Sequence, residues 1–138
     1  MTEAFVWQLR VYWEDTDAGG VVYHSQYLNF FERARTEWLR SRGIVQSELS
    51  QQHNLVFAIR HMDIDFLKPA RMDDELEVSV RAVQPGASRL RFEQELKRAD
   101  DDQVLCKATV SAACLEADRF RPARIPQWLK DAIGAQQQ

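Results

Sequence analysis

Residues 25–43 read SQYLNFFERARTEWLRSRG, and this stretch decides the fold. Its apolar residues recur every three or four positions, which is the period of an α-helix with one buried face. Ser25 is a favourable N-cap, and Gly43 is a favourable helix stop. The sequence therefore predicts an amphipathic helix of about four to five turns. Its apolar stripe consists of Tyr27, Leu28, Phe30, Phe31, Ala34, Trp38 and Leu39.

The segments around this helix alternate between apolar and polar residues, which is typical of β-strands with one buried face. Alternation is found in residues 5–13, 62–66, 76–82, 90–96 and 104–114. Shorter helices are predicted over residues 47–53 and 126–133. One long helix beside several one-sided strands predicts an α+β fold, with an antiparallel sheet curled around the helix.

The length of 138 residues fits one domain over residues 1–138, of which about 134–138 are expected to form a frayed tail. A net charge of −3 argues against nucleic acid as the main partner. No apolar run approaches the ~20 residues of a membrane span, and the N-terminus lacks the features of a signal peptide. We therefore expect a cytoplasmic protein.

Cysteine and histidine are too sparse, and too unsuitably spaced, to predict a metal site. Cys106 and Cys114 lie in one apolar segment with strand alternation, so we expect two small buried side chains rather than a disulfide. We predict neither a metal nor a cofactor.

Residues 12–27 read YWEDTDAGGVVYHSQY and carry the chemistry. They place Glu14, Asp15 and Asp17 in a glycine-bearing loop directly before the long helix. Helix N-terminal amides can hold an oxyanion, and a nearby carboxylate can attack a carbonyl or deprotonate water. The same pattern is typical of a turn with solvated carboxylates, so the residues alone leave both interpretations open. In an extended loop, Asp15 and Asp17 would point in similar directions.

A resemblance favours the catalytic interpretation. The runs 14–17, 20–24 and 32–35, together with Tyr27, closely resemble the 4-hydroxybenzoyl-CoA thioesterase-like family of hotdog proteins. Within that family the chain looks most like the bacterial Tol–Pal-associated acyl-CoA thioesterases. The likeness covers nearly the whole chain and includes the order of the strands.

The resemblance implies a hotdog-fold acyl-CoA thioesterase with catalytic Asp17 and with His24 as a catalytic or positioning residue. It implies substrate-binding positions at Gly20, Val22, Tyr23 and Ser25, with a helix-start amide near His24 polarising the thioester carbonyl. It also implies a homodimer with sites at the subunit interface, paired into a tetramer. Histidine at position 24 disfavours a 4-hydroxybenzoyl substrate. Acyl carrier protein is a second candidate carrier of the acyl group.

Two other functions are compatible with a hotdog fold. One is a hydroxyacyl dehydratase, which the aspartate loop fits poorly, and the other is a non-catalytic acyl-CoA-binding or scaffold protein. On the helix, Glu32 and Arg35 are expected to form a structural ion pair. Candidate cations for the phosphates of CoA are Arg60, Lys68, Arg71, Arg89, Arg91, Lys97 and Arg98.

Overall fold

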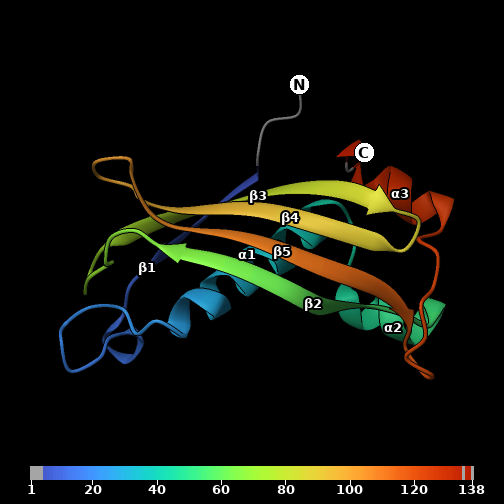
Figure 1. Ribbon diagram of the computed structural model, residues 1–138, viewed down its shortest axis with the longest axis horizontal. Coiled ribbons are helices and arrows are strands. Elements are labelled where there is room, and N and C mark those ends of the chain that lie inside the picture. Colours follow the sequence, from blue (N-terminus) through green and yellow to red (C-terminus); the bar gives the residue numbers. More distant parts are fainter. Residues whose placement is uncertain (1–4, 135, 138) are drawn as a thin grey trace.

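An antiparallel sheet forms the largest element of the chain (Figure 1). The computed structural model describes residues 5–134 and 136–137. Its strands run in the order β1-β3-β4-β5-β2, and every neighbouring pair in this series is antiparallel. Their bounds are β1 Phe5–Arg10, β2 Leu55–Phe66, β3 Glu75–Gly86, β4 Arg89–Arg98 and β5 Gln103–Glu116.

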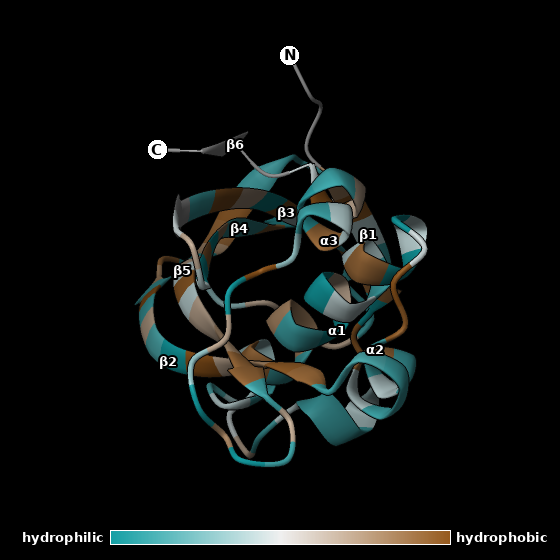
Figure 2. Ribbon diagram, turned by 90° about the vertical axis from the view of Figure 1, so that its right-hand side faces the viewer, coloured by the Kyte–Doolittle hydropathy of each residue, from teal (hydrophilic) through white to brown (hydrophobic). Residues whose placement is uncertain are grey.

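Helix α1 (Gln26–Ser41) lies inside the curve of this sheet. Figure 2 shows the strands arching around α1, with α2 (Gln46–His53) and α3 (Gln127–Ile133) at its side. The predicted α+β architecture is therefore confirmed. No helix in the described ranges is long and apolar enough to cross a membrane.

The apolar stripe of α1 fills the core, as the sequence predicts. Six of its seven predicted members are buried, namely Tyr27, Phe30, Phe31, Ala34, Trp38 and Leu39. Ser25 occupies the N-cap position, but its side chain makes no capping hydrogen bond. Gly43 follows the helix with a φ of +79°, a conformation that favours glycine and ends the helix.

Strand β1 ends earlier than its alternation predicts. The pattern continues to Trp13, but the strand stops at Arg10 and residues Trp13–Asp15 form a short 3₁₀ helix. The amide of Tyr12 donates to Oδ2 of Asp15 (2.9 Å), which bends the chain into a turn. As a result the Trp13 side chain is 79% exposed rather than buried with the strand.

Strand β2 begins earlier than predicted, at Leu55 rather than Met62. Residues 55–59 are apolar without interruption, so alternation gives no signal there. Strand β5 holds Cys106 and Cys114 as free, buried thiols, which confirms that prediction. Burial raises the pKa of Cys106 to about 12 and that of Cys114 to about 11, so both thiols stay protonated near neutral pH.

The C-terminal end differs from the frayed tail that the sequence predicts. Gln136–Gln137 form β6, which pairs in parallel with Val83 and Gln84 of β3. Within the described residues, β1 pairs with Glu75 to Val80, and β6 pairs with β3 beyond that stretch. Ala135 and Gln138 lie outside the described residues.

Candidate active site

Asp15 anchors the loop that precedes α1. Its side chain is only 5% exposed. Its carboxylate accepts hydrogen bonds from the amide of Tyr12 and from Nε2 of Gln26, both at 2.9 Å. Because Gln26 is the first residue of α1, this carboxylate joins the short 3₁₀ helix to the start of the long helix. Asp15 is therefore a structural residue.

Asp17 has the opposite environment, because its side chain is exposed at a tight turn. The Gly20 amide donates to the Asp17 carbonyl (3.0 Å), and the Asp17 amide donates to the Val21 carbonyl (2.9 Å). Gly20 has a φ of +78°, which a side chain would strain. The Gly19 amide donates to Oδ1 of Asp17 (2.8 Å), so the loop itself orients this carboxylate.

The loop is fastened to the segment that follows β2. The Val22 amide donates to the Ala70 carbonyl (2.8 Å), and the Ala70 amide donates to the hydroxyl of buried Tyr27 (3.1 Å). Val21 forms a further bridge with Arg71. Burial raises the pKa of Tyr27, so its hydroxyl remains a neutral acceptor. These bonds hold the Asp17 loop and the first turn of α1 in a fixed relation.

A hollow of about 320 Å³ lies where these segments meet. Asp17 and His24 both line it, together with Val21, Val22, Tyr27, Phe66, Leu67, Lys68 and Pro69. Asp17 also lines a second hollow, shared with Gly20, Trp13 and Met72. An exposed carboxylate between two partly apolar hollows can meet an electrophilic carbon that carries an apolar group.

The two residues just before α1 offer backbone donors, and one of them, His24, lines this hollow. Of the hydrogen bonds made within residues 5–134 and 136–137, none is donated by the amide of His24 or of Ser25. Such unpaired amides at a helix start carry partial positive charge. They are the kind of group that stabilises an oxyanion.

The predicted site residues are only partly brought together. Asp17, His24 and Val22 share one hollow, and Gly20 lies in the neighbouring one. Tyr23 lines neither hollow; it is 47% exposed, and its ring lies 4.4 Å from that of His24, centre to centre. Ser25 is exposed at the helix start and lines neither hollow.

Several lining residues were not predicted as site residues. Phe66 and Leu67 are each about half exposed, and Trp13 is more exposed still. Lys68 is the one member of the predicted cation set that reaches the Asp17 hollow. Phe66 follows the alternation of β2, but nothing in the pattern indicates that the end of this strand meets a loop more than forty positions earlier.

Two expectations about charged side chains have different outcomes. The parallel direction expected of Asp15 and Asp17 in an extended loop does not apply, because Trp13–Asp15 form a 3₁₀ helix that turns Asp15 inward. The predicted ion pair of Glu32 and Arg35 is wrong. Glu32 and Arg35 do not form a direct ion pair in the described chain. Glu32 accepts from the hydroxyl of Thr36 (2.7 Å), whereas Arg35 is buried and donates to Oε1 of Gln94 (3.0 Å).

A sheet wrapped around one long helix, with a carboxylate loop at the start of that helix, defines a hotdog-fold thioester hydrolase. The chain belongs to the thioesterase-like superfamily, whose sequence profile matches residues 11–133. The predicted family, fold class and enzyme class are thereby confirmed.

Individual relatives match over nearly their full length. The chain is 41% identical to an acyl-CoA thioesterase, YbgC, of Haemophilus influenzae, over 96% of each chain. It is 39% identical to an acyl-CoA thioester hydrolase, YbgC, of Escherichia coli, over 91% of this chain and 92% of the relative. The solved structure of a 1,4-dihydroxy-2-naphthoyl-CoA thioesterase from Synechocystis superposes with a TM-score of 0.89, at 30% identity and over 96% of each chain.

Proposed function

We propose that this chain hydrolyses acyl-CoA thioesters to a free carboxylic acid and the CoA thiol. The observation that carries the proposal is the setting of Asp17. Its carboxylate is exposed, is oriented by the Gly19 amide and shares a hollow with His24 at the start of α1. No cation forms a salt bridge with it in the described ranges. The names of the similar proteins support the same substrate class.

Asp17 can act either as a general base or as a nucleophile. As a general base it takes a proton from water, the water oxygen attacks the thioester carbon, and the C–S bond breaks to release the thiolate. As a nucleophile it forms a mixed anhydride with release of thiolate, and water then hydrolyses the anhydride. In both, the backbone amide of His24 holds the negative oxygen. His24 positions the carbonyl or the water.

The two ends of the substrate meet different parts of the site. Phe66 and Leu67 offer apolar surface to the acyl group, and Lys68 offers positive charge. Among the predicted CoA-binding cations, Arg98 and Lys97 already pair with carboxylates, Arg98 with Asp74 and Lys97 with Asp102. We therefore assign Lys68 the first contact with the anionic carrier, whether that carrier is CoA or acyl carrier protein.

The exposed apolar side chains around Asp17 also support a homodimer. Trp13, Phe66 and Leu67 are each more than half exposed in the single chain. A second copy seated there would cover this apolar surface, as the resemblance implies, and two such dimers would form the tetramer. Light scattering coupled to size-exclusion chromatography measures the assembly. A mass of one chain at micromolar concentration would contradict it.

A thiol-release assay over short, long and aromatic acyl-CoAs tests the function. We expect release from at least one class by the wild type and none above background by Asp17→Asn, the matched control. Binding of every acyl-CoA without thiol release would instead indicate a binding protein. Dehydration of 3-hydroxyacyl thioesters without thiol release would indicate a dehydratase.

A further inference from the structure

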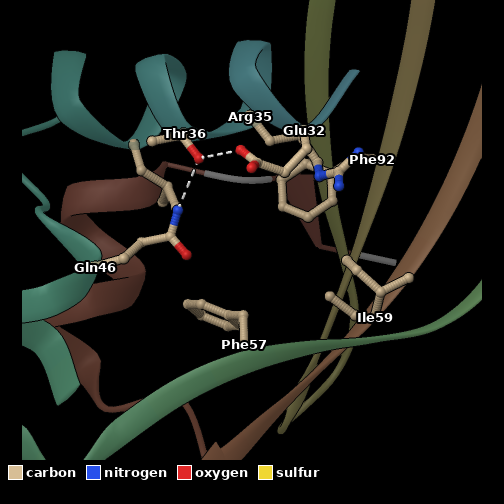
Figure 3. A pocket seen from close by; sticks show the side chains of 9 residues that line it. Glu32, Arg35, Thr36, Gln46, Phe57, Ile59 and Phe92 are labelled. Atoms are coloured by element: carbon tan, nitrogen blue, oxygen red, sulfur yellow. Dashed lines mark hydrogen bonds between the residues drawn. The ribbon is translucent and has the colours of Figure 1, made fainter. Parts of the chain in front are cut away.

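A third hollow, of about 240 Å³, lies on the same helix but away from Asp17. It is bounded by α1, the first residue of α2 and strands β2, β4 and β5, and Figure 3 shows it from close by. Arg35, at its inner side, lies about 14 Å along α1 from Gln26. The lining residues are Glu32, Arg35, Thr36, Leu39, Gln46, Phe57, Ile59, Phe92 and Ala112. None of them lines either hollow beside Asp17.

Arg35 is the unusual member of this lining, because it is a buried guanidinium whose hydrogen-bond partner is neutral and whose nearby carboxylate, Glu32, forms no ion pair with it in the described ranges. Its side chain is 8% exposed. Nη1 donates to Oε1 of Gln94 (3.0 Å), and Nε2 of Gln94 donates onward to the Phe31 carbonyl (3.1 Å). The guanidinium carbon lies 5.9 Å from the centre of the Phe92 ring. A buried charge is costly unless a partner of opposite charge meets it.

The other donors of Arg35 open into the hollow. A guanidinium carries five N–H donors, and Gln94 accepts only one of them. Within residues 5–134 and 136–137, no buried side-chain nitrogen lacks a hydrogen-bond partner. The remaining Arg35 nitrogens are therefore accessible, and the accessible space beside them is this hollow.

The rest of the hollow combines a polar rim with apolar walls. Figure 3 shows Thr36 bonded to both Glu32 (2.7 Å) and Gln46 (3.0 Å), with Phe57 and Ile59 across the space from them. Glu32 is exposed, so water screens its repulsion of an anion, and its Oε2 is engaged by Thr36. Arg35 thus keeps its direct donors for a ligand.

We propose that this hollow binds a small amphiphilic carboxylic acid, whose carboxylate pairs with Arg35 and whose apolar body lies against Phe57, Phe92 and Ile59. A planar guanidinium fork matches a carboxylate, and aromatic walls match a hydrocarbon or a ring. The volume is below the roughly 300–1,000 Å³ of sites for drug-sized ligands, which fits a small acid. The acid released by the proposed hydrolysis belongs to this class, and only that link depends on the proposed function.

Calorimetric titration with sodium octanoate tests the site directly, with 1-octanol as the neutral probe of equal length. We expect the wild type to bind octanoate more tightly than octanol. Arg35→Met should weaken octanoate binding about tenfold or more and leave octanol binding unchanged, because only the charged contact is lost. Equal octanoate affinity in the wild type and a folded Arg35→Met protein would overturn the proposal.

Two further variants separate this site from the active site. Ala112→Leu adds volume on the β5 side of the hollow and keeps the Arg35 guanidinium, so a folded Ala112→Leu protein should bind octanoate more weakly even where Arg35→Met fails to fold. Asp17→Asn should bind octanoate as the wild type does, whether or not the wild type hydrolyses thioesters. Octanoate binding that is lost in Lys68→Ala but kept in Ala112→Leu would place the acid beside Asp17 and overturn the proposal.

Discussion

Two aspartates two residues apart, Asp15 and Asp17, occupy opposite environments in the same loop. Asp15 is buried and accepts two hydrogen bonds, one from the chain before it and one from α1. The Asp17 side chain is exposed, and among the described residues its carboxylate accepts one hydrogen bond, from the Gly19 amide in the same turn. The difference shows that burial and hydrogen bonding give two identical side chains different capacities. The carboxylate with partners holds the loop, and the carboxylate facing the hollow is available to a substrate.

The largest expected effect is on turnover in Asp17→Asn. The amide oxygen keeps the bond from Gly19, so stability should change by no more than about 0.5 kcal/mol. Turnover should fall by about a hundredfold to ten-thousandfold, the usual contribution of a group that transfers a proton. Steady-state thiol release and urea unfolding of the same preparation measure the two quantities.

Asp15→Ala should show the reverse pattern. The Tyr12 amide, in a partly buried hydrogen bond, and the Gln26 side chain both lose their acceptor, which should lower the free energy of unfolding by about 1–3 kcal/mol. Glu14→Ala is the matched control, because Glu14 is exposed and should change stability by less than about 0.5 kcal/mol. Equal unfolding midpoints for the two variants would show that Asp15 does not anchor the loop.

His24→Ala should have a smaller effect on turnover. As a positioning residue, His24 should contribute about tenfold, less than the hundredfold expected of a group that transfers the proton. His61→Ala, exposed on β2 outside the Asp17 hollow, controls for loss of an imidazole. Unchanged kinetics in His24→Ala would show that this histidine does not assist turnover and has a structural role, such as its contact with Tyr23.

The smallest expected effect is on the labelling of the two buried cysteines, Cys106 and Cys114. Burial raises the pKa of Cys106 and Cys114 to about 12 and about 11, so neither forms thiolate at pH 8. A thiol reagent should label neither cysteine in the folded protein and both after unfolding. Rapid labelling of the native protein would show that β5 opens readily.

The periodic parts of the fold could be predicted from the sequence, and the irregular parts could not. The α1 stripe and the alternation in β3, β4 and β5 follow from burial of one face, which the sequence displays directly. The early end of β1 depends on one bond between Tyr12 and Asp15, and β6 depends on its pairing with Val83 and Gln84 of β3. Such features arise from particular contacts rather than from a repeat.

The site shows the same division. The family resemblance indicated Asp17 and His24, and the structure places both on one hollow because the loop and the helix start are contiguous in the chain. Local sequence was not sufficient to find Phe66 and Leu67, which reach the hollow only through the curl of the sheet. Nor could spacing on α1 show that Arg35 turns inward to Gln94 rather than pairing with Glu32. Contacts between distant segments required the structure.

The most direct test of the account is a single-turnover experiment on acyl-CoA bound to Asp17→Asn, with Asp15→Asn alongside it. With enzyme in excess, the rate of thiol release isolates the chemical step from binding and product release. We expect Asp17→Asn to bind acyl-CoA and release almost no thiol, while folded Asp15→Asn releases thiol at close to the wild-type rate. Release by Asp17→Asn at the wild-type rate would contradict the account.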